Sequence, residues 1–409
     1  MNIEQINRIL QETAYIRTGG SEQELRCANY LKAQCEALGF SAQLEEFNVP
    51  MASIKNVKLT VDGKEIPCKG YLCAGSSEVE AELLYMPEPT ACALSQCRGK
   101  IVMLDGYLGY WKYQDILANG AIGFITYDGN ANYADEDIDQ RELRSYVSKG
   151  VKIPGANINA KSAIALVAAG AKQAKIILEQ DETIGQSHNV ICDIPGETDE
   201  WIVLTAHYDT TSLSTGAYDN MSGCIGLLGI AKVLGKKPLR RGLRLIFCGS
   251  EERGLLGSKA YCAAHEDALG KVALNVNLGM IGSIMGPFAA ICTTEERLVH
   301  FIEYLASIEG FSLKARQDIY SSDSTPFADK GVPAVSFARQ ATNNTATIHN
   351  SYDTLKVMSA AQLAADIDFI CKFVSVMASA CHFPVKREMP DKMKDKLDNY
   401  LLRKRPKDA

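Results

Sequence analysis

The sequence contains no long hydrophobic run. No stretch of about 18 consecutive apolar residues occurs among its 409 residues, so we expect no transmembrane span. The first ten residues mix polar and apolar side chains at helical spacing and lack the apolar core of a secretory signal. An excess of positive charge is also absent, because the formal net charge is -6, which gives no reason to expect a nucleic-acid partner. We therefore expect a cytoplasmic protein.

The thirteen cysteines do not form a disulfide framework. Their number is odd, and they are scattered through apolar segments, which is typical of free cysteines that pack as small core residues in a reducing compartment. The pairs Cys68/Cys73 and Cys92/Cys97 fall within loose zinc-ligand spacing, but no turn-rich knuckle flanks them. We do not expect a structural zinc there.

Several catalytic motifs are missing as well. His265-Glu266 has no second histidine at the spacing of a His-Glu-x-x-His zinc motif. No Gly-x-Ser-x-Gly occurs, which disfavours a serine nucleophile elbow, and no Gly-x-x-x-x-Gly-Lys-Ser/Thr phosphate loop is present. These absences leave the scattered histidines and carboxylates as the main candidates for chemistry.

From about residue 186 the pattern alternates strands with helices, which predicts a mixed, mostly parallel sheet flanked by helices. Residues 1–48 add two helical patterns and a strand, with Ser21 and Glu24 as a capping box and Gly39 as the C-cap of the second helix. The expected strands are 201–206, 243–248, 272–277 and 332–337, and the expected helices are 220–235, 254–264, 295–308, 324–330 and 359–381. Residues 1–48 and 186–385 are therefore expected to form one α/β domain.

Residues 49–185 have a different pattern. They start with a hairpin on Asp62-Gly63 and contain no histidine, and their polar residues form no ligand cluster. We expect a β-rich α+β module inserted into the α/β domain and shaping access to its site. Residues 386–409 form a basic tail in which Met393, Leu397 and Leu401 are spaced as in an amphipathic helix. Such a helix could dock on its own chain or on a partner.

Metal-ligand residue types follow the predicted strands of the α/β domain. His207 and Asp209 follow the first strand, Asp219 opens a helix, and the adjacent Glu251 and Glu252 follow the second strand. Because sites in open α/β sheets form at the carboxyl ends of strands, these loops are expected to meet. Imidazole and carboxylate ligands suit zinc, and adjacent glutamates allow one to ligate while the other acts as a base. His188, His265, His300 and His382 have no such neighbours.

Five segments resemble the di-zinc exopeptidases of the aminopeptidase Y, bacterial leucyl aminopeptidase and glutamate carboxypeptidase group. They are Leu204-Thr-Ala-His-Tyr-Asp-Thr-Thr, Gly216-Ala-Tyr-Asp-Asn-Met-Ser-Gly, Phe247-Cys-Gly-Ser-Glu-Glu-Arg-Gly-Leu-Leu-Gly-Ser, Gly331-Val-Pro-Ala-Val-Ser and His349-Asn-Ser-Tyr-Asp-Thr. The resemblance covers residues 186–385 and, loosely, 1–48. It implies a zinc exopeptidase-like fold, and residues 49–185 look like the protease-associated domain that many members carry as an insertion.

The resemblance also implies a role for each site residue. His207 and Glu252 would hold one zinc, Asp219 would bridge two ions, and His349 would hold the other. Asp209 looks like the carboxylate that orients His207. Glu251 looks like the general base that takes a proton from metal-bound water and delivers it to the leaving amine.

One position departs from the family pattern. The family has Asn-x-Asp-Met where this sequence has Asn277-Leu-Gly279-Met, and that Asp would ligate the ion that His349 holds. Asn277 or Asp323 could replace it, so the sequence leaves open a chain with one ion, with a repaired second site, or without turnover.

The first hypothesis is thus a zinc aminopeptidase acting on peptides. A related carboxypeptidase or amidase and a non-catalytic binding scaffold remain as alternatives. The carboxypeptidase ranks lower because no arginine-rich clamp for a carboxylate is evident near the motifs.

Overall fold

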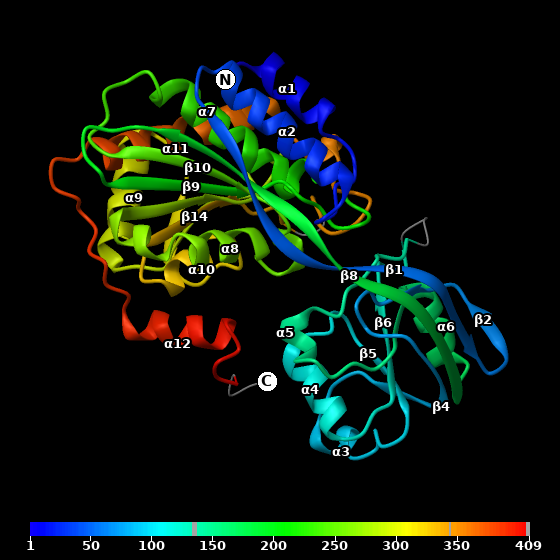
Figure 1. The fold of residues 1–409 in the computed structure, drawn as a ribbon. Helices are drawn as coiled ribbons and strands as arrows, with labels where there is room; N and C mark the ends of the chain where they lie inside the picture. Colours follow the sequence, from blue (N-terminus) through cyan, green and yellow to red (C-terminus); the bar gives the residue numbers. More distant parts are fainter. Residues whose placement is uncertain (133–136, 343–344, 406–409) are drawn as a thin grey trace. The chain divides into compact units, whose positions relative to one another are not determined.

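The computed structural model describes residues 1–132, 137–342 and 345–405 of the chain, whose ribbon is drawn in Figure 1. The chain divides into two compact units. The first consists of Met1–Phe47 and Gln186–Lys404, and the second of Asn48–Gly185 and Arg405–Ala409. Residues 133–136 of the expected insertion, 343–344 of the expected α/β domain and 406–409 of the expected tail lie outside the described residues.

The first unit is built on a mixed, mostly parallel sheet, as predicted. Its strands follow the order β13-β12-β14-β11-β9-β10-β8, in which the pairs β12/β14 and β10/β8 are antiparallel and the other pairs are parallel. The strands are β8 (Gln173–Ile194), β9 (Trp201–His207), β10 (Gly242–Cys248), β11 (Val272–Leu278), β12 (Phe288–Cys292), β13 (Lys314–Gln317) and β14 (Ala334–Arg339).

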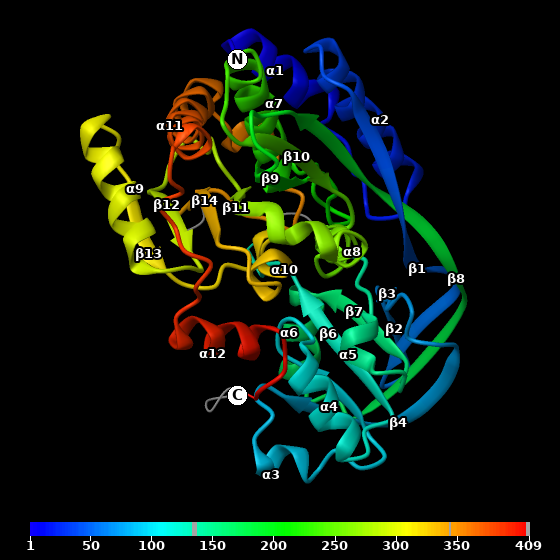
Figure 2. The same ribbon diagram turned by 60° about the vertical axis from the view of Figure 1, so that its left-hand side comes forward.

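Helices cover both faces of this sheet, and Figures 1 and 2 show α7 and α11 on one face and α8 and α10 on the other. The main hydrophobic core lies under the first of these faces, and a smaller core with Tyr261 and Phe327 lies under the second. The helices of this unit are α1 (Ile3–Glu12), α2 (Glu22–Ala37), α7 (Ser222–Leu234), α8 (Leu256–Ala264), α9 (Glu296–Ile308), α10 (Ser324–Asp329), α11 (Ala360–Ser379) and α12 (Asp391–Tyr400).

Burial on both faces explains why the central strands are almost continuously apolar. In β9, Ile202 and Leu204 belong to the main core, whereas Val203 belongs to the core on the opposite face. A strand that is covered on both sides carries a hydrophobic run instead of an alternating pattern. The run in β9 ends at His207, so the first titratable side chain of the strand stands at its carboxyl end.

In the second unit the strands pair in the order β8-β4-β5-β6-β7-β3, and strands β4 to β7 are parallel. The Asp62-Gly63 hairpin predicted from sequence joins β1 and β2. Its strands are β1 (Ala42–Val61), β2 (Lys64–Ile66), β3 (Lys69–Gly70), β4 (Ser77–Met86), β5 (Ile101–Leu104), β6 (Gly123–Asp128) and β7 (Gly155–Asn159), and its helices are α3 (Ala91–Leu94), α4 (Tyr110–Ala118), α5 (Ser145–Ser148) and α6 (Ala160–Ala168). Strands β1 and β8 run from one unit into the other.

The tail contains the short helix α12, whose Leu397 packs with Ala328 and Ala334 of the first unit. No helix in the described part of the chain is long and apolar enough to cross a membrane.

Candidate metal site at the carboxyl ends of the strands

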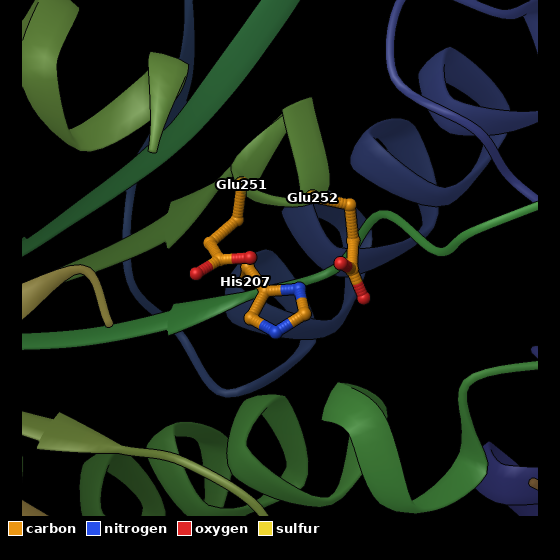
Figure 3. A group of neighbouring side chains, drawn as sticks. All are labelled: His207, Glu251 and Glu252. Atoms are coloured by element: carbon orange, nitrogen blue, oxygen red, sulfur yellow. The ribbon is translucent and has the colours of Figure 1, made fainter. Parts of the chain in front are cut away.

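The predicted site residues lie together at one edge of the sheet. His207 is the last residue of β9, and Glu251 and Glu252 form a short turn shortly after β10 ends. Strands β9 and β10 are parallel neighbours, with His207 opposite Cys248, so both loops leave the sheet at the same edge. In Figure 3 the two glutamates leave the same turn, and their carboxylates lie on either side of the His207 imidazole. These residues therefore lie at the carboxyl ends of neighbouring parallel strands, as predicted.

Asp209 connects the two loops. Its carboxylate accepts the backbone N–H groups of Glu251 at 2.9 Å and of Glu252 at 3.1 Å. One of its oxygens also lies 3.4 Å from Nδ1 of His207. Asp209 is fully buried, so these groups are its main compensation for leaving water. It fixes the glutamate turn and faces the imidazole that it was predicted to orient.

A second carboxylate, which the sequence analysis assigned to a helix cap, supports the same turn. Ser21 caps α2 as predicted, but the side chain of Glu24 does not complete a capping box. Instead, Glu24 accepts hydrogen bonds from the N–H of Gly20 at 2.6 Å and from the N–H and hydroxyl of Ser250 at 2.7 and 3.1 Å. Ser250 has a left-handed backbone, with φ of 52°, directly before Glu251. Glu24 thus holds a strained residue in place.

The ligand types form two overlapping groups among the described residues. One group is His207, Glu251 and Glu252, and the other is Asp219, Glu252 and His349; within each, one ligand atom per residue lies within 4.8 Å of the others. Nε2 of His349 lies 3.2 Å from an oxygen of Asp219 and 3.1 Å from an oxygen of Glu252. Nε2 of His207 lies 3.0 Å from the other oxygen of Asp219. Asp219 thus stands between the two histidines, as a bridging ligand would.

The electrostatics of these groups favour a bound cation. Burial lowers the pKa of His349, but the facing carboxylates of Glu252 and Asp219 outweigh this effect and raise the pKa to about 11. Burial, opposed by the charge of His207 and reinforced by the charge of Glu252, raises the pKa of Glu251 well above the usual value of a glutamate. Mixed nitrogen and oxygen donors converging on a point are suited to zinc. The residues present therefore fit a metal ion.

Two further residues, to which no role was assigned from the sequence, hold the loop that carries Asp219. Asp353 accepts the N–H groups of Tyr218 at 2.9 Å and of Asp219 at 3.1 Å. The fully buried Arg17 donates to the carbonyl oxygens of Tyr208, Thr13, Tyr15, Thr215 and Gly216. The spacing of His349 and Asp353 was a visible signal, whereas Arg17 lies far away in the sequence and has none.

The two side chains that could replace the ligand absent at Gly279 are both buried. Asn277 is buried and accepts a hydrogen bond from the hydroxyl of Thr205 at 3.0 Å. Asp323 is also buried, and this burial raises the pKa of its carboxyl group to about 6. The carboxylate of Asp323 belongs to neither of the two ligand groups found among the described residues.

Comparisons with known proteins agree with this site. Residues 189–374 match the model of Peptidase family M28. The sequence is 25% identical over 346 residues to Aminopeptidase YwaD of Bacillus subtilis, covering 80% of this chain and 73% of that protein. It is 27% identical to Leucine aminopeptidase 2 of Trichophyton rubrum, covering 65% of this chain and 55% of that protein.

Solved structures share the fold of the chain. A zinc aminopeptidase from Bacillus subtilis has a TM-score of 0.77 at 24% identity, covering 95% of this chain and 98% of the other. An aminopeptidase from Aneurinibacillus sp. strain AM-1 has a TM-score of 0.76 at 23% identity, covering 94% and 96%. The matched segment contains His207, Asp219, Glu251, Glu252 and His349. Residues 189–374 are therefore similar to Peptidase family M28, and this matched segment contains the candidate metal site.

Proposed function

We propose that the chain is a zinc-dependent aminopeptidase that removes N-terminal residues from peptides, with Glu251 as the general base. The observation that carries this proposal is the pair of adjacent glutamates. Glu252 belongs to the ligand group with Asp219 and His349, and Glu251 extends from the same turn beside His207. One glutamate is thereby available as a ligand and its neighbour as a proton acceptor.

Asp219, Glu252 and His349 would hold the metal ion. A bound zinc would supply a water molecule with a lowered pKa and would polarise the scissile carbonyl group. Glu251 would take the proton from that water and deliver it to the nitrogen of the leaving amine. Asp209 fixes the backbone of both glutamates, so it controls where Glu251 accepts the proton.

The preference for a free N-terminus is supported by the charge of the site and by the relatives. Several carboxylates surround the site, which favours a substrate with a positively charged amino group over one ending in a carboxylate. The relatives described above are named aminopeptidases. A carboxypeptidase would instead need a cationic clamp for its substrate.

The binding-scaffold alternative rests on Gly279. Against it stands the arrangement of Glu251, whose turn is held by Asp209 on one side and, through Ser250, by Glu24 on the other. Two buried carboxylates that fix a general base are costly to keep in a protein that only binds.

A panel of substrates tests the proposed function. Aminoacyl fluorogenic substrates, their N-acetylated forms and C-terminally free peptides are compared with chelated and zinc-loaded protein. We expect zinc-dependent cleavage of the free aminoacyl substrates and at least about a hundredfold less cleavage of the acetylated forms, because a charged group that anchors a substrate typically contributes several kcal/mol. Cleavage of N-blocked peptides from their C-terminus would contradict the aminopeptidase, and no zinc-dependent cleavage of any substrate would favour the scaffold.

The second unit is also given a role in the proposed function. We infer that residues 49–185 are a protease-associated-like module and that deleting them changes substrate preference while the metal site keeps zinc. Loops and inserted modules usually set access to a site. Loss of zinc binding on deletion would contradict this role. A cytoplasmic location stays a prediction.

A further inference from the structure

The His349 half of the site contains a full set of ligands for one zinc ion. Asp219, Glu252 and His349 each offer a ligand atom within 4.8 Å of the others, and the imidazole faces both carboxylates. Three protein ligands plus one water are the usual composition of a catalytic zinc site. This half therefore needs no further residue.

The ligand absent at Gly279 belongs to the other half, beside His207. In the parallel pair of β9 and β11, Thr205 lies opposite Asn277. Two residues further along, the same register places Gly279 opposite His207. Side chains two residues apart on a strand share a face, and the hydrogen bond between Thr205 and Asn277 shows that these faces meet. A side chain at position 279 would therefore lie next to His207.

This half keeps few ligands once Glu251 is the base. His207 remains, together with Asp219 and Glu252, which the other half already uses. Asn277 is bonded to Thr205, and Asp323 lies outside the ligand groups of the described residues. A second dication placed here would be held by one unshared ligand and repelled by the ion a few ångströms away.

We propose that the chain binds one zinc ion tightly, through Asp219, Glu252 and His349, and that Gly279 turns the position beside His207 into a weak metal site. The inference rests on the metal site of the proposed function and deepens it. It differs from the assignment that the family resemblance implies, in which His207 shares a zinc with Glu252 and the missing Asp belongs with His349.

The backbone at Gly279 would accept an ordinary side chain. Its φ lies outside the left-handed region that favours glycine. A Cβ atom there would meet the carbonyl oxygen of Phe337 and Cε1 of Tyr320, both at 3.5 Å, which are ordinary contacts. The N–H of Gly279 also continues the ladder to β14, donating to Phe337 at 2.9 Å. An aspartate can therefore be introduced without rebuilding the strand.

The first experiment counts zinc in the dialysed full chain by elemental analysis and native mass spectrometry. We expect about one zinc per chain in the natural protein and about two in Gly279→Asp, because the new carboxylate completes three ligands beside His207. Gly279→Asn is the matched control, with nearly the same shape and no charge, and should stay at about one. Two tightly held ions in the natural protein, or equal zinc content in the Asp and Asn variants, would overturn the proposal.

The second experiment identifies which half holds the ion. His349→Ala should lose the tight zinc, whereas His207→Ala should keep about one zinc per chain, since a tight zinc site of this kind requires three protein ligands. Circular dichroism checks that both variants fold. If one histidine variant does not fold, the zinc content of Gly279→Asp still tests the position beside His207. If His207→Ala lost the tight zinc and His349→Ala kept it, the tight zinc would instead be held by His207, and the proposal would be wrong. A loss of zinc in Glu251→Gln would also overturn the proposal, because Glu251 would then be a ligand.

Zinc content separates this inference from the proposed function. One tight zinc without any peptide cleavage would support the inference and contradict the aminopeptidase. Two tight zinc ions in an active aminopeptidase would support the proposed function and contradict the inference.

Discussion

Both units of the chain collect carboxylates at the carboxyl ends of parallel strands, but the partners of these carboxylates differ. In the second unit, Asp105 follows β5 and accepts hydrogen bonds from the hydroxyl groups of Tyr85 and Tyr127, and Asp128 ends β6 and pairs with Arg141 and Asn157. Each charge there is met by a hydroxyl, an amide or a guanidinium group. The carboxylates at these strand ends therefore have hydrogen-bonding partners within their own unit.

In the first unit the carboxylates face imidazoles and one another. Asp219 stands between His207 and His349, and Glu252 faces His349. All six histidines of the chain lie in this unit by sequence. The difference between the two units is that the first gathers several carboxylates around two imidazoles at one edge of its sheet. The combined negative charge of these carboxylates is available to bind a cation.

The largest effect is expected for Glu251→Gln. The amide cannot accept the proton of the metal-bound water, so kcat should fall about a thousandfold or more, while the zinc content stays the same. Steady-state kinetics together with elemental analysis measure both quantities. The exposed Glu296 of α9, changed to Gln, is the control and should leave kcat unchanged. Turnover within about tenfold of the natural protein would show that Glu251 is not the base.

A smaller effect is expected for Asp353→Asn, which weakens the support of Asp219. An asparagine offers one acceptor in place of two, so the N–H of Tyr218 or of Asp219 loses its partner. Groups that orient metal ligands typically contribute 10–100-fold to metal affinity, so we expect a loss of about that size in competition with a chelator. Asp368→Asn, on the exposed side of α11, should have no effect. Unchanged zinc affinity in Asp353→Asn would mean that the Asp219 loop holds its shape without it.

In the second unit, Asp128→Asn should reduce stability and leave the metal site untouched. The variant loses the ion pair with Arg141, in which the two side chains are 15% and 20% exposed. We expect a loss of about 2 kcal/mol in the free energy of unfolding, measured with urea, because hydrogen bonds to charged groups contribute about that much. A fall in zinc content would contradict this prediction, because Asp128 would then affect the metal site of the first unit.

The smallest effect is expected for Asp105→Asn. The asparagine keeps one carbonyl oxygen that can accept from Tyr85 or Tyr127, so only part of the interaction is lost. The free energy of unfolding should fall by about 1 kcal/mol or less. A loss larger than that of Asp128→Asn would reverse the expected order of the two strand ends.

The sequence predicted the architecture of the first unit and the members of its site because both follow local rules. The apolar run of β9 ends at His207, and the run of β10 ends shortly before Glu251, so the strand-end argument needed no tertiary information. The Asp62-Gly63 turn was equally local.

The supporting groups could not be predicted because their partners are distant in the sequence. Glu24 looked like a capping residue, yet it bonds to Ser250, and Arg17 bonds to the loop that precedes Asp219. The place of Gly279 also required the register of β9 and β11, which no pattern in the sequence encodes. The pairing of β9 with β11 is what places Gly279, where the family pattern has an aspartate, beside His207.

The most direct test is a titration of the metal-free protein with zinc, in which bound zinc and aminopeptidase activity are measured in the same samples. A site formed by Asp219, Glu252 and His349, with Glu251 as the base, is complete with a single ion. The account predicts that activity rises with the first bound zinc and reaches its plateau at about one zinc per chain. Activity that appears only after a second zinc has bound would contradict it.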